Sequence, residues 1–237
     1  MNIVILTAAG SGTRMHQDIP KQFLHVDNKP IIAYTMEAFE NHPSIDAIVV
    51  VTIPSWKEVL YAYAKQFNVS KLSMVVDGGQ TGQESIYNGL KAIEEKYGVE
   101  GNTVIVHDGN RPLVSTEVIS DSLATYKQYG SSVAVIPCVE VMFSSEDGLL
   151  AEESIPRERL FRTQTPHVYS VEKLLWAHAE AKKRGLPNTA ASCDLMYRLG
   201  EKVYFSRGSE ENFKITTVDD LTMFKAMLKT RKDEWIK

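Results

Sequence analysis

A run of small residues followed by two cations carries the strongest chemical signal in the chain. The run is Ala8-Ala9-Gly10-Ser11-Gly12, and Arg14 and Lys21 come after it. Small residues at the carboxyl end of a first parallel strand let backbone N–H groups approach a ligand closely, where open α/β sheets bind their ligands. The two cations can neutralise a triphosphate through charge-assisted contacts that are stronger than neutral ones. We therefore expect a phosphate-bearing ligand at this turn.

Other uses of a glycine-rich turn compete with this interpretation. The glycines alone also fit a tight strand-to-helix turn without a ligand, and it is the two cations that favour phosphate. Met15 stands where a dinucleotide fingerprint has its third glycine, and the Gly-x-x-x-x-Gly-Lys-Ser/Thr pattern of a P-loop is absent. Both the dinucleotide and the P-loop interpretations are weakened.

The second chemical cluster is His107-Asp108-Gly109-Asn110-Arg111-Pro112, after another apolar run. A carboxylate such as Asp108 at a strand end can hold Mg²⁺ beside substrate phosphates, because this ion takes one or two carboxylates and otherwise keeps water or phosphate oxygens. The alternative is an Asp-Gly turn in which Asp108 caps a helix. Since both clusters follow parallel strands, they would face one crevice, and the metal interpretation is favoured.

A third patch, Gly78-Gly79-Gln80-Thr81-Gly82-Gln83-Glu84-Ser85, again leads from a strand into a helix. Its small and amide residues suit hydrogen bonds to the edge of a base. Taken alone, Ser85 fits a helix N-cap at least as well as a ligand contact.

Short β-branched runs alternate with longer segments of helical period, so we predict an α/β fold with a mostly parallel sheet covered by helices on both faces. The predicted strands are Ile3–Thr7, Ile48–Ile53, Ser73–Val76, Thr103–His107, Ser132–Pro137 and Val203–Ser206. Apolar residues three or four apart predict four helices between them, around Ile32–Phe39, Val59–Phe67, Ile86–Tyr97 and Ile119–Tyr126.

One segment breaks this alternation. Residues 139–159 alternate weakly and contain the turn Ser144-Ser145-Glu146-Asp147-Gly148, so we predict a projecting β-hairpin arm over about residues 138–160. Helices are predicted at Val171–Arg184, Ser192–Leu199 and from Val218, where two aspartates suit a positive helix start. The absence of repeats and linkers favours a single domain over residues 1–237.

Composition limits the classes of function. The 237 residues carry 26 basic and 30 acidic side chains, which disfavours a general grip on nucleic acid. No stretch is long enough to span a bilayer, and the apolar start lacks the basic leader of a signal peptide. Cys138 and Cys193 are too few for a disulfide scaffold and are expected to be small core residues of a cytoplasmic protein. The six histidines show no metal-ligand spacing, and we expect His107 to be buried and bonded to its loop.

In combination, motifs along the whole chain resemble the cytidylyltransferases that make CDP-linked sugar alcohols from methylerythritol 4-phosphate or ribitol 5-phosphate. The matching residues are those of the three patches together with Pro20-Lys21-Gln22, Asn88-Gly89-Leu90, Arg157, Gln164-Thr165-Pro166, Asn212-x-Lys214-Ile215-Thr216-Thr217 and Asp220-Leu221.

The resemblance implies a CTP site, a catalytic magnesium ion and a set of residues for the nucleotide. The residues expected at the nucleotide are Ala8, Ala9, Gly10, Gly12, Gly79, Gln80, Ser85, Asp108 and Arg111. Catalytic contacts to the phosphates are expected from Arg14, Lys21 and Lys214, and Asp108 would also serve the metal.

It further implies a homodimer in which the arm crosses to the partner, so that Arg157 and Thr165 hold the acceptor phosphate. Several positions depart from the family, mostly on the acceptor side. Glu140-Val141 replace a usual Asp-Thr pair, Gly82 stands in place of an arginine, Ala190-Ala191 align with a Thr-Asp pair, and Glu211 precedes the Asn212-x-Lys214 motif.

The acceptor therefore stays open between methylerythritol 4-phosphate, ribitol 5-phosphate and a relative, and the pathway stays open between isoprenoid precursors and cell-wall or capsule precursors. Two alternatives are a nucleotidyltransferase for another base or a sugar 1-phosphate, and a nucleotide-binding regulator without catalysis.

Overall fold

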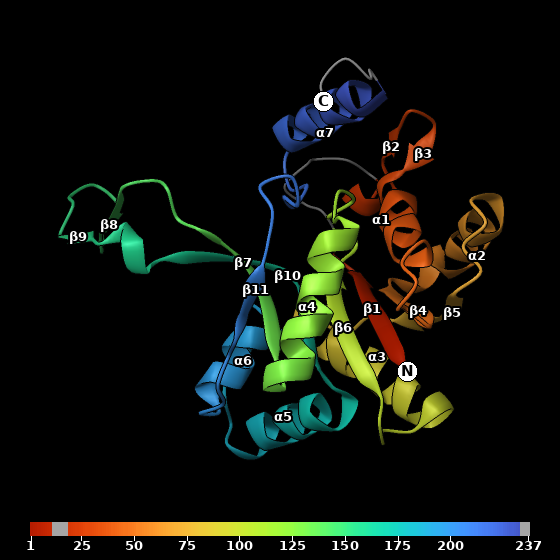
Figure 1. Cartoon of the computed structure of the whole chain (residues 1–237), viewed down its shortest axis with the longest axis horizontal. Coiled ribbons are helices and arrows are strands. Elements are labelled where there is room, and N and C mark those ends of the chain that lie inside the picture. Colours follow the sequence, from red (N-terminus) through yellow and green to blue (C-terminus); the bar gives the residue numbers. More distant parts are fainter. Residues whose placement is uncertain (11–18, 233–237) are drawn as a thin grey trace.

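The computed structural model of the chain describes residues 1–10 and 19–232, and its centre is a seven-stranded sheet in the order β11-β7-β10-β6-β1-β4-β5 (Figure 1). The strands are β1 (Asn2–Ala8), β4 (Ala47–Thr52), β5 (Leu72–Asp77), β6 (Thr103–Asp108), β7 (Ser132–Pro137), β10 (Phe161–Ser170) and β11 (Phe205–Arg207). Only β10 runs antiparallel to its neighbours β6 and β7, while every other pair is parallel. The predicted α/β class with a mostly parallel sheet is confirmed.

All six predicted strands are present within two residues of their predicted ends. The prediction was wrong in omitting β10, which lies in the middle of the sheet between β6 and β7. The strand contains Arg162, Thr163, Gln164 and Pro166, so it lacks the continuous apolar run of a buried strand. A two-stranded ribbon of β2 (His25–Val26) and β3 (Lys29–Pro30) was also not predicted.

Helices cover both faces of the sheet, as predicted. One apolar cluster joins the sheet to α1 (Ile31–Glu40), α2 (Lys57–Gln66) and α4 (Thr116–Tyr129). A second cluster on the opposite face joins it to α3 (Gly82–Tyr97), α5 (Val171–Lys183) and α6 (Ser192–Arg198). Among the described residues, no helix is long and apolar enough to cross a bilayer.

The helices begin where side chains can accept the first free backbone N–H groups. The hydroxyls of Thr81, Ser115 and Ser170 accept hydrogen bonds from residues three positions later, at the starts of α3, α4 and α5. At the start of α7 (Val218–Lys232), the Asp220 carboxylate accepts from the backbone N–H groups of Thr216 and Thr217. The predicted helix start with two acidic residues is confirmed.

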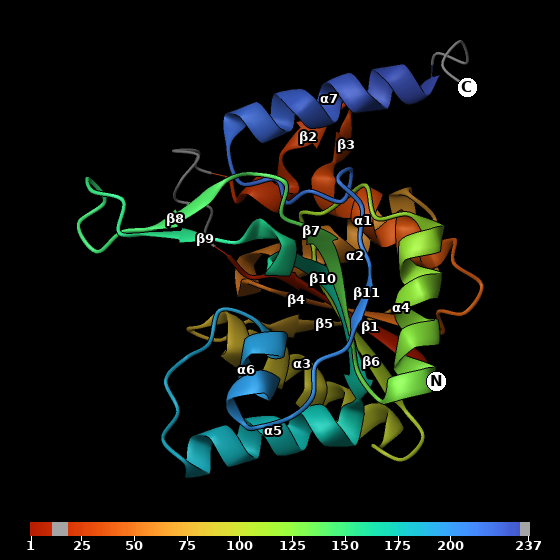
Figure 2. The same ribbon diagram turned by 60° about the vertical axis from the view of Figure 1, so that its left-hand side comes forward.

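The arm is the part of the chain that projects from the sheet (Figures 1 and 2). It leaves β7, forms β8 (Met142–Ser144) and β9 (Glu153–Ile155), passes through a 3-10 turn at Arg157–Arg159, and returns as β10. The prediction of a hairpin is confirmed. Apolar side chains on the arm face solvent, and the most exposed are Leu149, at 92%, and Leu150, at 69%.

Helix α7 crosses one end of the molecule above the β2-β3 ribbon (Figure 2). Its buried Phe224 packs with Ile31, Leu113 and Ile215 in a separate apolar cluster. This packing holds the segment before α7, which carries Lys214, against the carboxyl end of the sheet.

Candidate active site

The loops after β1, β5 and β6 lie at the same edge of the sheet, because the adjacent strands β6, β1, β4 and β5 are parallel and their carboxyl ends point the same way. A Cβ atom on Gly78, after β5, would collide with the Cβ of Ala9, after β1. A Cβ on Gly109, after β6, would lie 3.0 Å from the carbonyl oxygen of Thr7. Glycine at both positions thus permits the chain after β5 and the chain after β6 to approach the end of β1 closely. The described residues of the first two clusters thus lie side by side, as expected, and the start of the third patch lies beside them.

The loop after β1 is held by a side chain to which we assigned no role from the sequence. The buried amide of Gln22 donates to the carbonyl oxygens of Ala8 and Gly10, the latter at 3.2 Å. Thr52 donates to the same Ala8 oxygen at 3.3 Å. Lys21 precedes Gln22 in the 3-10 helix η2 (Lys21–Phe23). The predicted ligands Gly12 and Arg14 lie outside the described residues.

The loop after β5 is shaped by hydrogen bonds from α3 to its backbone. The Ser85 hydroxyl accepts from the N–H of Gly79 at 3.0 Å and donates to the carbonyl of Thr81 at 2.9 Å. The Glu84 carboxylate accepts from the N–H of Gln80 at 2.7 Å. Thr81 is the N-cap of α3, so the alternative that Ser85 caps the helix is wrong. Ser85 instead determines the path of the loop expected to face the base.

Asp108 ends β6 between two cations. Its Oδ1 lies 2.8 Å from Nζ of Lys214, and its Oδ2 accepts from Nε of Arg111 at 2.9 Å. Burial alone would raise the pKa of Asp108, but the Lys214 ammonium and the Arg111 guanidinium more than offset this and hold the pKa well below its usual range. Asp108 does not cap a helix, since α4 begins at Thr116 with Ser115 as its cap.

Behind Asp108, the buried imidazole of His107 links the strand end to β10. Its Nε2 faces the carbonyl oxygen of Arg111 at 3.3 Å, so Nε2 carries the proton and Nδ1 accepts from the hydroxyl of Thr165 at 3.0 Å. The same hydroxyl accepts from the N–H of Asp108 at 3.1 Å. Burial lowers the pKa of His107 to about 3, so the imidazole is neutral at pH 7. The expectation of a buried histidine bonded to its loop is confirmed.

The segment that carries Lys214 is tied to β10 by amide side chains. Gln164 donates to the carbonyl of Ser209 at 2.8 Å and accepts from the Ser209 N–H at 3.1 Å. The side chain of Asn212, fully buried, donates to the carbonyl of Thr165 at 2.8 Å, and the backbone carbonyl of Asn212 accepts from Nη1 of Arg111 at 2.7 Å. These partners lie 45 to 101 residues apart, and no spacing pattern predicts their pairing.

The two residues expected at the acceptor lie in different surroundings. Thr165 is buried beside Asp108, with its hydroxyl bonded to His107 and to the Asp108 N–H. Arg157 is an arm residue that donates to the carbonyl of Val139 at 2.7 Å and lies 4.0 Å from the carboxylate of Glu158. Both of these partners belong to the arm itself.

In the described part of the chain, no group of three or more His, Cys, Asp or Glu side chains could hold a metal ion. Asp108 is a single carboxylate whose two oxygens each accept one hydrogen bond from a cation. A carboxylate offers about four acceptor positions, so room for one metal contact remains. The donor set suits an ion that takes most of its ligands from a bound phosphate chain.

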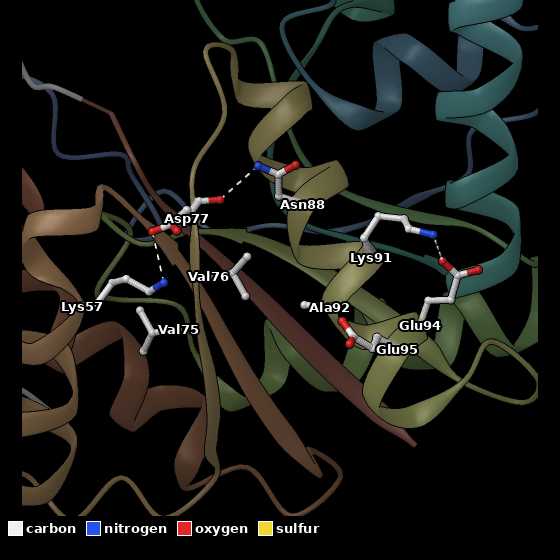
Figure 3. Close-up of a pocket in the computed structure, with 9 residues that line it drawn as sticks. All are labelled: Lys57, Val75, Val76, Asp77, Asn88, Lys91, Ala92, Glu94 and Glu95. Atoms are coloured by element: carbon white, nitrogen blue, oxygen red, sulfur yellow. Dashed lines mark hydrogen bonds and ion pairs between the residues drawn. The ribbon is translucent and has the colours of Figure 1, made fainter.

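A separate cleft of about 740 Å³ lies along the edge strand β5 (Figure 3). Lys57 pairs with the Asp77 carboxylate at 3.2 Å, and Asn88 donates to the Asp77 carbonyl at 3.1 Å. Figure 3 shows these side chains around the point where β5 ends. Residues of the Asp108 cluster do not line this cleft, so it is distinct from the candidate site.

Comparisons with known proteins show which family this chain resembles. A family model described as 2-C-methyl-D-erythritol 4-phosphate cytidylyltransferase matches residues 2–230. A ribitol-5-phosphate cytidylyltransferase of Lacticaseibacillus paracasei is 39% identical over 98% of this chain and 100% of its own length. A 2-C-methyl-D-erythritol 4-phosphate cytidylyltransferase of Clostridium botulinum is 38% identical over 96% of this chain and 97% of its own length.

Solved structures of similar proteins share the fold of this chain. The 2-C-methyl-D-erythritol 4-phosphate cytidylyltransferase of Thermus thermophilus superimposes with a TM-score of 0.76 at 28% identity, covering 96% of this chain and 98% of that one. A 4-diphosphocytidyl-2C-methyl-D-erythritol synthase of Anaerococcus prevotii has a TM-score of 0.82 at 21% identity over 96% of both chains, which shows the shared fold.

Proposed function

The chain belongs to the 2-C-methyl-D-erythritol 4-phosphate cytidylyltransferase family and is a cytidylyltransferase, and on that premise we propose that it transfers CMP from CTP to a polyol phosphate with release of pyrophosphate. The observation that carries the proposal is Asp108 held between Lys214 and Arg111, at the point where the loops after β1, β5 and β6 meet. One carboxylate with two cations leaves a local excess of positive charge, which suits a triphosphate.

The nucleotide would lie across the three loops. The backbone after β1, braced by Gln22, and the Gly79 loop, braced by Ser85, offer closely approachable backbone groups to cytidine. Lys21 and Lys214, with Arg14 outside the described residues, would contact the phosphates. Both the proposed base contacts and the proposed phosphate contacts then come from loops that the parallel sheet brings together.

The reaction needs no protein nucleophile. The phosphate oxygen of the acceptor is already anionic near neutral pH, so it attacks the α-phosphorus of CTP, the bond from that phosphorus to the bridging oxygen breaks, and pyrophosphate leaves. The protein must align the two substrates and cancel the charge that builds up as two polyanions meet. Lys21 and Lys214 would serve this purpose.

Magnesium fits the site as a companion of the nucleotide. Asp108 would hold the ion on an acceptor position not used by Lys214 or Arg111. When bound, Mg²⁺ would neutralise phosphate oxygens and withdraw electron density from the α-phosphorus. The charges of Lys214 and Arg111 disfavour a free cation here, so the ion would bind together with CTP.

The acceptor is proposed to be ribitol 5-phosphate or 2-C-methyl-D-erythritol 4-phosphate, the compounds named in relatives of almost equal identity. Arg157 and Thr165 would hold its phosphate, with Arg157 supplied by the arm of a second copy. In a homodimer whose arms cross, contact with the partner would cover the exposed arm residues Val141, Phe143 and Leu149. We place the enzyme in the cytoplasm, where two free, buried cysteines stay reduced.

A substrate panel tests the proposal. Purified protein with Mg²⁺ is given CTP, UTP, GTP or ATP together with ribitol 5-phosphate, methylerythritol 4-phosphate, a sugar 1-phosphate or no acceptor. We expect pyrophosphate release and a CDP-alcohol, identified by mass, only with CTP and a polyol phosphate. Turnover confined to another nucleotide or a sugar 1-phosphate, or CTP binding without any turnover, contradicts it.

A further inference from the structure

Asn110 forms a two-bond clamp on the segment that carries Lys214. Its side-chain amide donates to the backbone carbonyl of Ile215 at 2.5 Å, and the backbone carbonyl of Asn110 accepts from the Ile215 N–H at 2.9 Å. The two residues are 105 positions apart, and Asn110 is only 5% exposed. The buried side chain thus adds a second bond to a backbone bond, and together they constrain where the Ile215 peptide lies.

The clamp lies between two contacts of the charged cluster. On one side, Lys214 reaches Asp108 at 2.8 Å, and on the other, Arg111 donates to the carbonyl of Asn212 at 2.7 Å. Residues 108–111 and 212–215 are thereby joined at successive points. These contacts form a closed ring. The ring runs from Asp108 along the chain to Asn110, across the clamp to Ile215, back along the chain to Lys214, and across the ion pair to Asp108.

The lysine depends on such a ring because it is otherwise poorly restrained. The Lys214 side chain is 40% exposed, whereas that of Asp108 is 16% exposed. A lysine has a flexible four-carbon stem and loses substantial rotamer entropy when its ammonium is held in one place. The backbone anchor next to Lys214 therefore decides whether Nζ meets Asp108 and the phosphates.

We propose that Asn110 is a positioning residue for the transfer reaction, which holds Lys214 in register with Asp108. The inference rests on the proposed role of Lys214 at the phosphates. The competing explanation is that Asn110 only stabilises the fold, because Ile215 is fully buried and packs with Phe224 and Ile31. The two explanations differ in what happens when Lys214 is already absent.

The test uses N110A, N110D and a matched control, N102D. An ionised aspartate side chain in N110D cannot donate to the Ile215 carbonyl, and N110A removes the donor without adding charge. Asn102 precedes β6, whereas Asn110 follows it, and both residues are buried. The Asn102 side chain donates to the carbonyls of Tyr97 and Gly98 at 3.0 Å. It lies at the opposite end of the strand from the site.

For N110A and N110D we expect kcat to fall about 10- to 100-fold, the loss expected when a catalytic group such as the Lys214 ammonium is misplaced by about 1 Å. KM for CTP is expected to change by less than about threefold. N102D is expected to lower the melting temperature but to keep kcat within about twofold of the wild-type value. In a K214A background, N110A is expected to cause no further loss of kcat, since residues acting through one another are not additive.

A further loss of about tenfold in the K214A background overturns the inference, because two residues acting through one another would not be additive. Wild-type kcat in a folded N110A protein overturns it as well. If N110D does not fold, the kcat of N110A alone tests the inference. An N110A protein that does not fold shows that Asn110 serves the fold and also overturns the inference. Failure of the proposed function is recognised separately, because wild-type protein would then not consume CTP, or K214A would be fully active.

Discussion

The ammonium of Lys214 lies 2.8 Å from the carboxylate of Asp108, although the two residues are 106 positions apart in the chain. Asp108 ends a central strand, whereas Lys214 belongs to a segment between β11 and α7. The fold thus brings a cation from the C-terminal part of the chain to the strand end where a metal and a triphosphate are proposed. Burial would raise the pKa of Asp108, but the Lys214 ammonium together with the Arg111 guanidinium more than offsets this and keeps the carboxyl ionised.

Removal of the Lys214 ammonium is expected to slow catalysis more than it weakens CTP binding. K214A should lower kcat by about 10²-fold or more, by analogy with the loss of one preorganised donor to a developing charge. K57A is the control, because Lys57 pairs with Asp77 beside the separate cleft. Initial rates of pyrophosphate release give kcat and KM. A K214A enzyme within about threefold of wild-type kcat would exclude Lys214 from the reaction.

Removal of the Thr165 hydroxyl leaves two buried groups without partners. T165V keeps the shape of the side chain but orphans the Asp108 N–H and Nδ1 of His107, so the free energy of unfolding should fall by about 1–3 kcal/mol. T165S keeps the hydroxyl and should recover most of this loss. Urea denaturation measures both variants. A T165V protein as stable as wild type would show that these hydrogen bonds contribute little.

The same pair of variants tests whether Thr165 also contacts the acceptor. If it does, KM for the polyol phosphate rises in T165V and returns toward the wild-type value in T165S. An unchanged KM for the acceptor in folded T165V limits Thr165 to its bonds with His107 and Asp108.

Stability is expected to fall on mild acidification, partly because of His178. Burial lowers the pKa of this imidazole from 6.5 to about 4, so between these values the unfolded chain binds a proton that the folded chain does not. The free energy of unfolding therefore decreases as pH falls through this window, by up to about 1.4 kcal/mol per pH unit for one histidine. Below about pH 4 the contribution of His178 levels off.

H178F should reduce this pH dependence while it keeps the ring contact with Tyr87, whose centroid lies 5.5 Å from the imidazole. His107 and His167, with pKa values lowered to about 3 and about 4 by burial, would account for much of the remaining slope. Urea denaturation at several pH values between neutrality and the lowered pKa of His178 measures the slope. The same slope in H178F and wild type would contradict a half-buried His178 that stays neutral in the folded protein.

The arm can be removed at a point that the structure defines. The N–H of Cys138 donates to the carbonyl of Leu160 at 2.9 Å, so an Asn-Gly turn can replace residues 139–159 and close the β7–β10 pair. We expect this shortened protein to be monomeric by light scattering, to bind CTP with wild-type affinity and to lose acceptor turnover. R157A keeps the arm and should mainly raise KM for the acceptor. Full turnover by the shortened monomer would refute a role of the arm in acceptor binding.

Sequence reasoning predicted the elements well where local patterns are strong. The buried parallel strands are continuous apolar runs, and the helices show clear three- or four-residue spacing, so their positions match closely. The strand β10 was missed because Gln164 and Thr165 are polar. Their side chains bond to Ser209, Asn212 and His107 rather than pack in an apolar core. A polar strand in the centre of a sheet is intelligible only once its distant partners are known.

The candidate site was predictable only in part, because local patterns indicate which loops meet but not which side chains pair across them. Glycines and charged residues after predicted parallel strands indicated which loops would meet. The pairing of Lys214 with Asp108, the support of Ala8 by Gln22 and the clamp of Asn110 on Ile215 are contacts between segments whose relative position is set by packing. Residue type and spacing carry no information on such pairs, and the resemblance supplied only the residues, not their contacts.

The most direct test of the whole account is a crystal structure of the protein with CTP and Mg²⁺. We predict the cytosine beside the Gly79–Ser85 loop, the triphosphate between Lys21 and Lys214, and the metal between the phosphates and Asp108. CTP bound elsewhere, for instance in the cleft along β5, or no CTP at a concentration that saturates turnover, would contradict it.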